Sequence, residues 1–224
     1  MLREVGSSME ATVWFLTSNQ GKLEEAQLHF APLGYNIEQL VVPEDAIIEP
    51  QSDSLQDIAI SKLEQAKAHL PDANAMVMVE DSGLFINALD GFPGVYSSYV
   101  HETIGCQGIL RLLAHLESDD PVQHKKLRGA SYHAVTALWD GTSMFVGLGE
   151  CPGSLASEMH EGHGFGYDPV FVPLDLDDFG QPLPAGELGA ISTHGMAFGG
   201  VELDVKHRFS HRRRALEHLL EQLP

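Results

Sequence analysis

The sequence predicts an α/β fold built on a mixed sheet, in one domain that spans the chain. In the first half, short apolar runs rich in β-branched residues alternate with segments of helical spacing. Two further runs then flank the turn Asp140-Gly141, which is typical of an antiparallel hairpin. With 224 residues, 43% of them hydrophobic, the chain is long enough to bury a core without disulfides.

The individual elements follow from these patterns. Strands are predicted over residues 11–17, 75–79, 129–139, 143–149 and 170–172. Helices are predicted over residues 23–30, 55–70 and 104–116 and over the segment that follows Ser210, a suitable N-cap. Residues 175–189, rich in Asp, Gly and Pro, are predicted as a loop, and residues 1–10 as an N-terminal extension.

The composition excludes several kinds of protein. Thirteen basic residues against 32 acidic ones give a net charge of −19, which would repel the phosphate backbone of a nucleic acid. No apolar run approaches the roughly 20 residues of a membrane-spanning helix. The two cysteines, Cys106 and Cys151, do not make a disulfide framework, which favours a reducing, cytoplasmic location. The acidity also fits adaptation to high salt, an alternative that stays open.

A polar turn, Thr17-Ser18-Asn19-Gln20-Gly21-Lys22, connects the first predicted strand to the first predicted helix. Backbone N–H groups at a helix N-terminus favour anions, and a lysine adds a positive charge. The spacing is not that of a P-loop. The turn therefore indicates either a phosphate site or an ordinary connection that Ser or Asn caps.

Two adjacent carboxylates occur in Glu80-Asp81-Ser82-Gly83, at the end of the second predicted strand. Ligands of α/β sheets lie beyond the carboxyl ends of strands, and carboxylates together with substrate phosphates suit Mg²⁺. Because adjacent strand residues face opposite sides, only one of the two carboxylates is expected to face a site. The same residues are also typical of a simple turn.

A glycine-rich segment, residues 162–169, precedes the last predicted strand. Its glycines allow close approach of the backbone to a ligand, Phe165 offers a platform for a flat base, and Asp168 offers a partner for the edge of that base. The alternatives are a plain loop, or a zinc site at His160 and His163 that lacks a third ligand.

A basic segment, residues 206–214, holds five of the thirteen Lys and Arg residues. Such segregation in an acidic chain indicates an anion site. The alternative is solvated charge at the start of a helix, although cations there oppose the helix dipole.

These four clusters, in this order, resemble the motifs of the inosine triphosphate pyrophosphatase family. The matching residues are Thr17, Asn19 and Lys22, then Asp81-Ser82-Gly83-Leu84 with Gly91-Phe92-Pro93-Gly94, then Gly164-Phe165-Gly166-Tyr167-Asp168-Pro169-Val170-Phe171, and finally Ser210-His211-Arg212. The resemblance spans residues 13–220 and implies an elongated mixed β-sheet flanked by helices, with two lobes around a central cleft. It also implies a homodimer and the Mg²⁺-dependent hydrolysis of ITP, dITP and XTP to the monophosphate and pyrophosphate, which cleanses the nucleotide pool.

The resemblance also implies roles for residues of this sequence. It makes Asp81 the general base and, together with Glu49, a ligand of Mg²⁺, although one carboxylate is poorly placed to do both in the same geometry. The residues that it assigns to substrate binding are Thr17, Ser18, Asn19, Gln20, Gly21, Lys22, Lys62, Ser82, Phe165, Gly166, Tyr167, Asp168, Lys206, His211 and Arg212.

Selectivity for deaminated bases has a physical explanation at such a site. Hypoxanthine and xanthine carry a keto group at C6, where adenine carries an amine. A donor such as Arg212 or His211 rewards the keto oxygen, whereas an amine leaves a buried donor unpaired at a cost of about 1–3 kcal/mol. This contact does not explain the exclusion of guanine, which has the same keto group.

Three features depart from the family pattern. Residues 198–201 (Phe-Gly-Gly-Val) lack an acidic residue that the family often has, residues 174–195 resemble an insertion, and Glu80 replaces an Asp, which is expected to be harmless. Two alternative functions stay open: a regulatory protein that binds purine triphosphates without hydrolysing them, and a pyrophosphatase for modified pyrimidines. Four histidines are expected simply to face water: His101, His115, His124 and His218.

Overall fold

The computed structural model describes residues 11–72, 74–162 and 164–223, so the expected extension at residues 1–10 lies outside the described residues. The helices and strands of the described part are β1 Ala11–Leu16, α1 Gln20–Phe30, β2 Tyr35–Gln39, α2 Leu55–Ala66, β3 Met76–Ile86, β4 Pro93–Gly94, α3 Ser97–Thr103, α4 Gly105–Leu112, α5 Pro121–Leu127, β5 Gly129–Trp139, β6 Met144–Leu155, β7 Phe171–Pro173, α6 Leu203–Phe209 and α7 His211–Leu220. None of these helices has the length and apolar character needed to cross a membrane.

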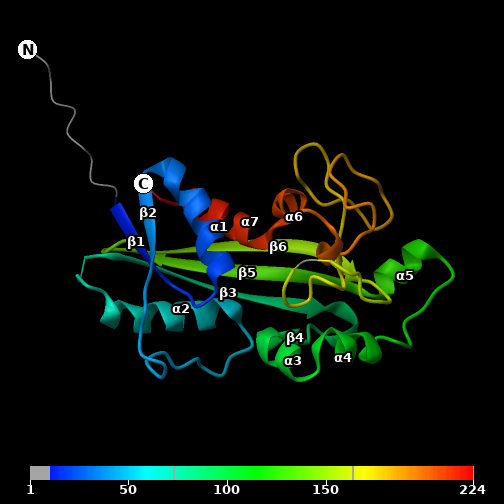
Figure 1. Cartoon of the computed structure of the whole chain (residues 1–224), viewed down its shortest axis with the longest axis horizontal. Coiled ribbons are helices and arrows are strands. Elements are labelled where there is room, and N and C mark those ends of the chain that lie inside the picture. The colour runs from blue at the N-terminus through cyan, green and yellow to red at the C-terminus, as the bar shows by residue number, and fades with distance from the viewer. Residues whose placement is uncertain (1–10, 73, 163, 224) are drawn as a thin grey trace, which may run out of the picture.

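The strands form one mixed sheet in the order β2-β1-β3-β5-β6-β7, with β4 paired to β3 (Figure 1). β1 pairs in parallel with β2 and β3, whereas the later pairs are antiparallel. The long hairpin of β5 and β6 runs along the long axis of the molecule. The predicted α/β fold, with its elongated mixed sheet and hairpin, is therefore confirmed.

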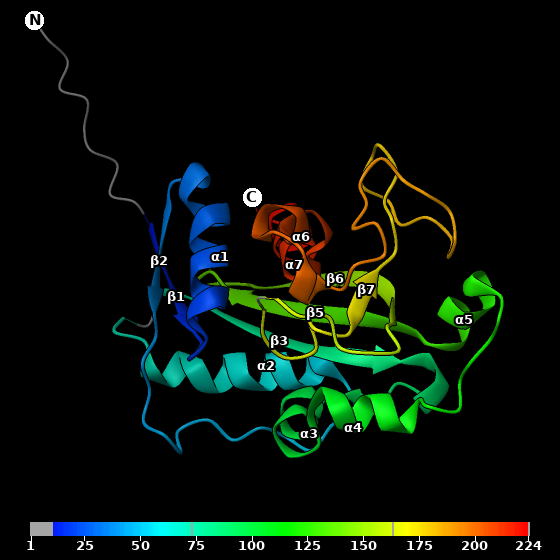
Figure 2. The same cartoon turned by 45° about the vertical axis from the view of Figure 1, so that its right-hand side comes forward.

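Helices cover both faces of the sheet (Figures 1 and 2). α1, α6 and α7 lie on one face, and α2, α3 and α4 lie on the other. Among the described residues, one buried cluster packs α1 and α7 onto the sheet around Phe15 and Phe30, and a second packs α2 around Leu63. A third, around Ile109 and Phe171, fills the end of the molecule near α4 and α6. Apolar burial on both faces explains why the first half of β3 is continuously apolar.

β3 has an uncovered stretch along one edge. β1 pairs with it as far as Leu16 opposite Val79, and β4 begins to pair at Gly94 opposite Leu84. Residues 80–83, between these two points, are paired with β5 on their other side. A cleft can therefore open beside this stretch, and side chains from both faces of the strand can reach it.

α7 lies directly against β6 because two glycines leave room for its backbone. A Cβ atom at Gly147 or Gly149 would collide with carbonyl oxygens of the helix. Ser210 caps the helix with its side chain, as predicted. The close contact fixes the first turn of α7, which carries His211 and Arg212.

Several predicted elements have different extents in the structure; for example, the strand expected over residues 143–149 is β6, which continues to Leu155. The strand expected to end at Val79 continues to Ile86, because the following residues keep pairing with β5 and do not form the expected turn. The helix expected over residues 104–116 is α4, which spans Gly105–Leu112 and is preceded by α3, a helix that the patterns did not predict. The two helices meet at Gly105, whose φ of +62° interrupts the helical path.

The elements that the patterns missed, β2, β4, α3, α5 and α6, are short, and none buries more than two residues. β2 has Ile37 as its buried residue, α5 has no buried residue, and α6 has Phe209. Without an apolar stripe or an alternation, such segments carry no periodic signal. α1 begins at Gln20 instead of Leu23, because Asn19 is the cap.

Candidate active site

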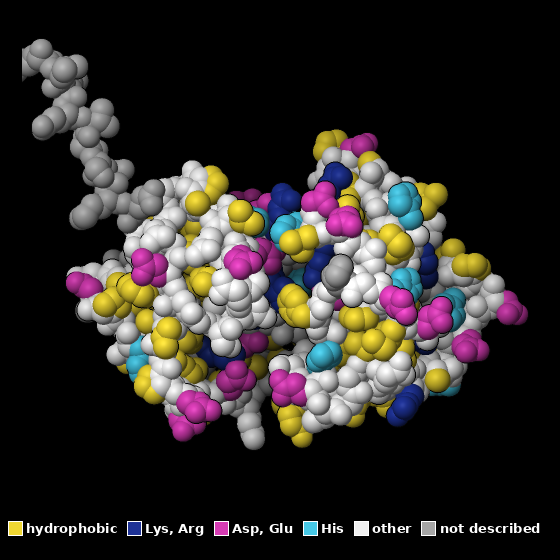
Figure 3. Space-filling view, in the orientation of Figure 1, with side chains coloured by type: hydrophobic (Ala, Val, Ile, Leu, Met, Phe, Trp, Pro, Cys, Tyr) yellow, Lys and Arg dark blue, Asp and Glu magenta, His cyan; other side chains and the backbone are white. Residues whose placement is uncertain are grey.

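A cleft of about 880 Å³ opens beside the uncovered edge of β3, where the resemblance places a central cleft. It is lined by residues of β1, α1, α2, β3, α3, α6 and α7 and by the loop at residues 165–168. Figure 3 shows Lys and Arg side chains around this hollow, with acidic side chains spread over the surrounding surface. An acidic chain thus gathers cations at one place.

On the α2 side of β3, Lys62 holds two carboxylates. Its Nζ lies 2.8 Å from Asp81 Oδ2 and also contacts Glu49. The other oxygen of Asp81 accepts a hydrogen bond from Ser82 N at 3.1 Å. Burial acts to lower the pKa of Lys62, but the two carboxylates outweigh it and raise this pKa above its ordinary value. The ammonium is therefore charged.

On the opposite face of β3, Glu80 binds two cations. Its Oε1 lies 3.1 Å from Lys22 Nζ on α1 and 3.1 Å from Arg212 Nε on α7. The side chain of Glu80 is 4% exposed; burial acts to raise its pKa, but the two cations lower this pKa below its ordinary value. Glu80 is therefore an ionised carboxylate in a buried position.

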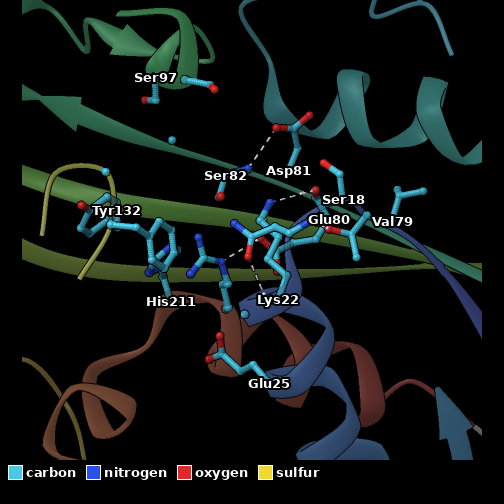
Figure 4. Close-up of a pocket in the computed structure, with 18 of the residues that line it drawn as sticks. Ser18, Lys22, Glu25, Val79, Glu80, Asp81, Ser82, Ser97, Tyr132 and His211 are labelled. Carbon is cyan, nitrogen blue, oxygen red and sulfur yellow. Dashed lines mark hydrogen bonds and ion pairs between the residues drawn. The ribbon is translucent and has the colours of Figure 1, made fainter. Parts of the chain in front are cut away.

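The expectation that one of the two adjacent carboxylates faces away from the site is wrong. Figure 4 shows Asp81 and Glu80 pointing to opposite faces of β3, as strand geometry requires. Both nevertheless line the cleft, because the cleft opens at the uncovered edge and reaches both faces of the strand.

The turn between β1 and α1 is held by its own side chains. Asn19 Oδ1 accepts from Lys22 N at 3.1 Å, and Asn19 N donates to Thr17 Oγ1 at 3.1 Å. The turn is thus a capped strand–helix connection that also lines the cleft. Gln20 is the exception: it does not line the cleft, and its amide donates to Glu24 Oε1 at 3.0 Å.

The glycine-rich loop presents an aromatic ring to the cleft. Phe165 is 49% exposed, and Lys206 Nζ and Arg212 Cζ lie 4.9 and 5.1 Å from its ring centroid. Both cations lie over the ring, so a flat ring stacked on Phe165 would lie close to two positive charges. Asp168 is buried, and its Oδ2 accepts from Phe165 N at 3.0 Å and pairs with Lys206 Nζ at 2.6 Å. Its carboxylate holds the loop and the lysine together.

A buried aromatic pair, Tyr132 and His211, lines the cleft beside this loop. The two rings are stacked, with centroids 4.8 Å apart and an angle of 9° between their planes. His211 Nε2 has no hydrogen-bond partner in the part of the chain that the structure describes. Burial lowers the pKa of His211 well below its ordinary value, and nearby cations, Arg212 first, lower it further. His211 is therefore neutral at pH 7.

α3 contributes residues that no sequence pattern identifies. Ser97, Ser98 and His101 line the cleft, and Tyr167 OH donates to Ser97 O at 2.9 Å. His101 packs edge-on against the Tyr167 ring at 5.2 Å, so the expectation that it simply faces water is wrong. These residues reach the site because the chain folds back so that β4 pairs with β3, which periodicity does not reveal.

The other three histidines expected to face water differ among themselves. His115 is exposed, as expected. His124 is partly buried, with Nε2 at 2.9 Å from Ser157 Oγ. His218 is exposed, and its Nδ1 also accepts a hydrogen bond from Leu148 N at 3.1 Å.

Glu49 and Asp81 provide oxygen atoms that suit a hard divalent cation. Both carboxylates contact the ammonium of Lys62, so their oxygens converge on one position of positive charge. Mg²⁺ commonly takes one or two carboxylates together with phosphate oxygens and water, and this donor set fits that preference. Within the described residues, no group of three His, Cys, Asp or Glu side chains is arranged to hold a metal. For the zinc alternative, His160 accepts a backbone hydrogen bond through Nδ1, and His163 lies outside the described residues.

The chain is similar to known proteins along nearly its whole length. The model of the Ham1 family matches residues 13–222. A dITP/XTP pyrophosphatase of Thermococcus kodakarensis is 39% identical over 90% of this chain and 91% of its own, and one of Hyperthermus butylicus is 36% identical over 96% of each chain. A solved structure of a HAM1 protein from Coxiella burnetii has a TM-score of 0.70 and 26% identity, and it covers 93% of this chain and 96% of its own.

Replacing His211 by Phe is expected to make the stability of the protein less dependent on pH. The imidazole has a lower pKa in the folded than in the unfolded chain, so below about pH 6.5 the unfolded chain binds more protons. This group therefore removes stability as the pH falls, by at most about 1.4 kcal/mol per pH unit. Phe keeps a ring beside Tyr132 and has no proton to bind.

The measurement is the free energy of unfolding in urea, above and below the ordinary pKa of histidine. From the higher to the lower pH, this free energy should fall less in His211→Phe than in the wild type. His115→Gln, which changes an exposed histidine, should behave like the wild type. An equal fall in all three proteins would contradict a neutral His211.

Proposed function

The chain belongs to the Ham1 family, and from this premise we propose that it hydrolyses deaminated purine nucleoside triphosphates. The substrates are ITP, dITP and XTP, and the products are the nucleoside monophosphate and pyrophosphate. The observation that carries the proposal is the arrangement along the open edge of β3. A carboxylate–lysine pair lies on one face, and two cations lie beside an exposed aromatic ring on the other. The first suits a triphosphate, and the second suits a flat base with keto groups.

In the proposed reaction, a water oxygen bonds to the α-phosphorus, and the bond from that phosphorus to the α–β bridging oxygen breaks. Pyrophosphate leaves with the electron pair of the broken bond. Asp81 orients the water and accepts its proton. Lys22 and Lys62 supply positive charge where negative charge develops on the phosphate oxygens. Glu49 would hold Mg²⁺, with Asp81 as a second ligand only in a geometry other than the one in which it accepts the proton. The metal would neutralise phosphate charge and polarise the reacting phosphoryl group.

The base end of the cleft favours a keto group. The guanidinium of Arg212 offers N–H donors and no acceptor. A keto oxygen at C6 accepts from such a donor, whereas the amine of adenine would leave it unpaired at a cost of about 1–3 kcal/mol. The neutral ring of His211 adds a polar edge without adding another charge.

The other residues that the resemblance assigns to substrate binding keep their implied roles, with two changes. Residues 17–22 and Ser82 would hold the triphosphate, but Gln20 would contribute only through its backbone because its side chain lies outside the cleft. Tyr167 and Asp168 would act by shaping the loop, because Tyr167 OH and Asp168 Oδ2 are bound to other parts of the protein.

The proposed assembly is a homodimer, and the proposed location is the cytoplasm. Phe92, Tyr96 and Tyr99 are exposed aromatic rings on one short segment at the start of α3. Aromatic residues are enriched at protein interfaces, which supports a second copy at this segment. Light scattering gives the mass of the purified chain in solution, and a monomer mass would contradict the dimer.

Incubation of the purified chain with ITP or ATP tests the proposed function. We expect Mg²⁺-dependent release of IMP and pyrophosphate from ITP, abolished by EDTA, and turnover of ATP slower by about ten- to a hundredfold. Nucleoside diphosphate and orthophosphate would place the attack at the γ-phosphorus. Tight binding without turnover would favour a regulatory protein, and a preference for modified pyrimidine triphosphates would favour that other class of pyrophosphatase.

Substitutions of the two acidic residues, Asp81 and Glu49, are expected to impair the activity in different ways. Asp81→Asn should lower kcat by at least about 100-fold, because an amide does not accept the proton from water. Glu49→Gln should raise the Mg²⁺ concentration for half-maximal rate by at least about tenfold, the lower end of the cost of losing a supporting group of a metal site. Glu64→Gln removes a carboxylate that pairs with Lys67 on the exposed side of α2 and should change neither. Wild-type turnover in Asp81→Asn would exclude Asp81 as the base.

A further inference from the structure

Glu80 connects the two ends of the cleft through one oxygen atom. Its Oε1 accepts from Lys22 Nζ, at the end proposed for the triphosphate, and from Arg212 Nε, at the end proposed for the base. Lys22 Nζ also reaches Glu80 O at 3.5 Å. The family motifs imply no role for this residue, and its replacement of Asp is expected from sequence to be harmless. The structure instead places it between two groups of the site.

The bond to Glu80 decides which part of the Arg212 guanidinium is available to a ligand. Because Nε is used by the carboxylate, the fork of two terminal nitrogens remains. The carbon that bears this fork lies 5.1 Å from the centroid of the Phe165 ring. The fork therefore lies close to any flat ring that stacks on Phe165.

The position of Glu80 is fixed from both sides. Its backbone pairs with Thr136 of β5, in the middle of the sheet. Its partner Arg212 is in the first turn of α7, which the glycines of β6 hold against the strand. Glu25, another carboxylate near this helix, accepts from Ser210 Oγ at 2.6 Å at the cap of α7. Glu25 also lines the cleft and acts on the guanidinium through its charge, but Glu80 is the carboxylate that is hydrogen-bonded to Arg212.

We propose that Glu80 is a positioning residue for base selection: by binding Arg212 Nε, it holds the guanidinium fork toward a base stacked on Phe165 and so sets the preference for 6-keto over 6-amino purines. This inference rests on the function proposed above. Discrimination requires that a donor facing an amine stay unpaired. A fork that is free to rotate would turn away from the amine and tolerate adenine.

Glu80→Gln tests the proposal, with the ratio of kcat/KM for ITP to kcat/KM for ATP as the readout. The amide has nearly the same shape but no charge, so it holds the guanidinium weakly, and we expect the ratio to fall by about tenfold. Damage to Lys22 or to the fold near the phosphates lowers both rates by the same factor, because ITP and ATP carry the same triphosphate. The ratio therefore separates positioning of Arg212 from a merely structural role.

Two further variants show whether Glu80 acts through Arg212. Arg212→Lys has no fork and should lower the ratio by itself. In that background, Glu80→Gln should lower the ratio no further, because the group through which it acts is gone. Lys22→Met should lower kcat/KM for both nucleotides and keep the ratio. An equal fall of the ratio with and without Arg212 would contradict the proposal.

Glu217→Gln is the matched control. It removes the same kind of bond, Arg213 Nε to Glu217 Oε1 at 2.7 Å, on the exposed side of α7, and should change neither the activity nor the ratio. Thermal unfolding of each variant reports whether it folds. If Glu80→Gln does not fold, Glu80→Asp carries the test: it keeps the charge but withdraws the carboxylate by about 1.5 Å. We then expect a fall of the ratio by about threefold, since part of the bond to the guanidinium is lost.

The possible results separate this inference from the proposed function. A wild type that prefers ITP, with folded Glu80 variants whose ratio stays within about twofold of it, overturns the positioning role and leaves the pyrophosphatase intact. A wild type that releases no IMP and pyrophosphate from ITP overturns the proposed function itself. A lower ratio in the Glu80 variants, absent in the Arg212→Lys background, supports both.

Discussion

The buried carboxylate of Glu80 compensates two cations that come from opposite ends of the chain, Lys22 of α1 and Arg212 of α7. Leaving one partner of a buried ion pair uncompensated costs roughly 3–5 kcal/mol, a large part of the stability of a typical domain. The same contact joins the first and last helices, which cover one face of the sheet (Figure 2). The positions of both cations in the cleft, and hence its shape, depend on this carboxylate.

The fold was predictable where the signal is local. The hairpin at Asp140-Gly141, the apolar strands and the Ser210 cap are visible in a few neighbouring residues, and the structure has them. The continuation of β3 past Val79 was not predictable in this way, because it depends on pairing with β5, 44 to 56 residues away in the sequence. For the site, every residue that the motifs assigned to it lines the cleft except Gln20. They missed His101, which tertiary packing brings to the cleft, and they gave no indication that Glu80 binds two cations.

The cations that line the cleft are opposite in charge to most of the surrounding surface. The chain has a net charge of −19, yet Lys22, Lys62, Lys206 and Arg212 all line one cavity. At physiological ionic strength, charges are screened beyond about 8 Å, so a ligand inside the cavity is influenced mainly by these nearby cations and their carboxylate partners. An anionic ligand is thus compatible with an acidic protein, because the local arrangement of charge decides binding at this range.

The uncovered edge of β3 bears on self-association as well as on binding. Unpaired backbone groups at a sheet edge invite strands of other molecules and so promote aggregation. Here the open stretch covers residues 80–83 and is bounded by β1 on one side and β4 on the other. A strand of typical length, about five or six residues, would collide with these neighbours, and the carboxyl groups of Glu80 and Asp81 flank its path. The protein therefore keeps backbone groups accessible to a small molecule while denying them to another polypeptide chain.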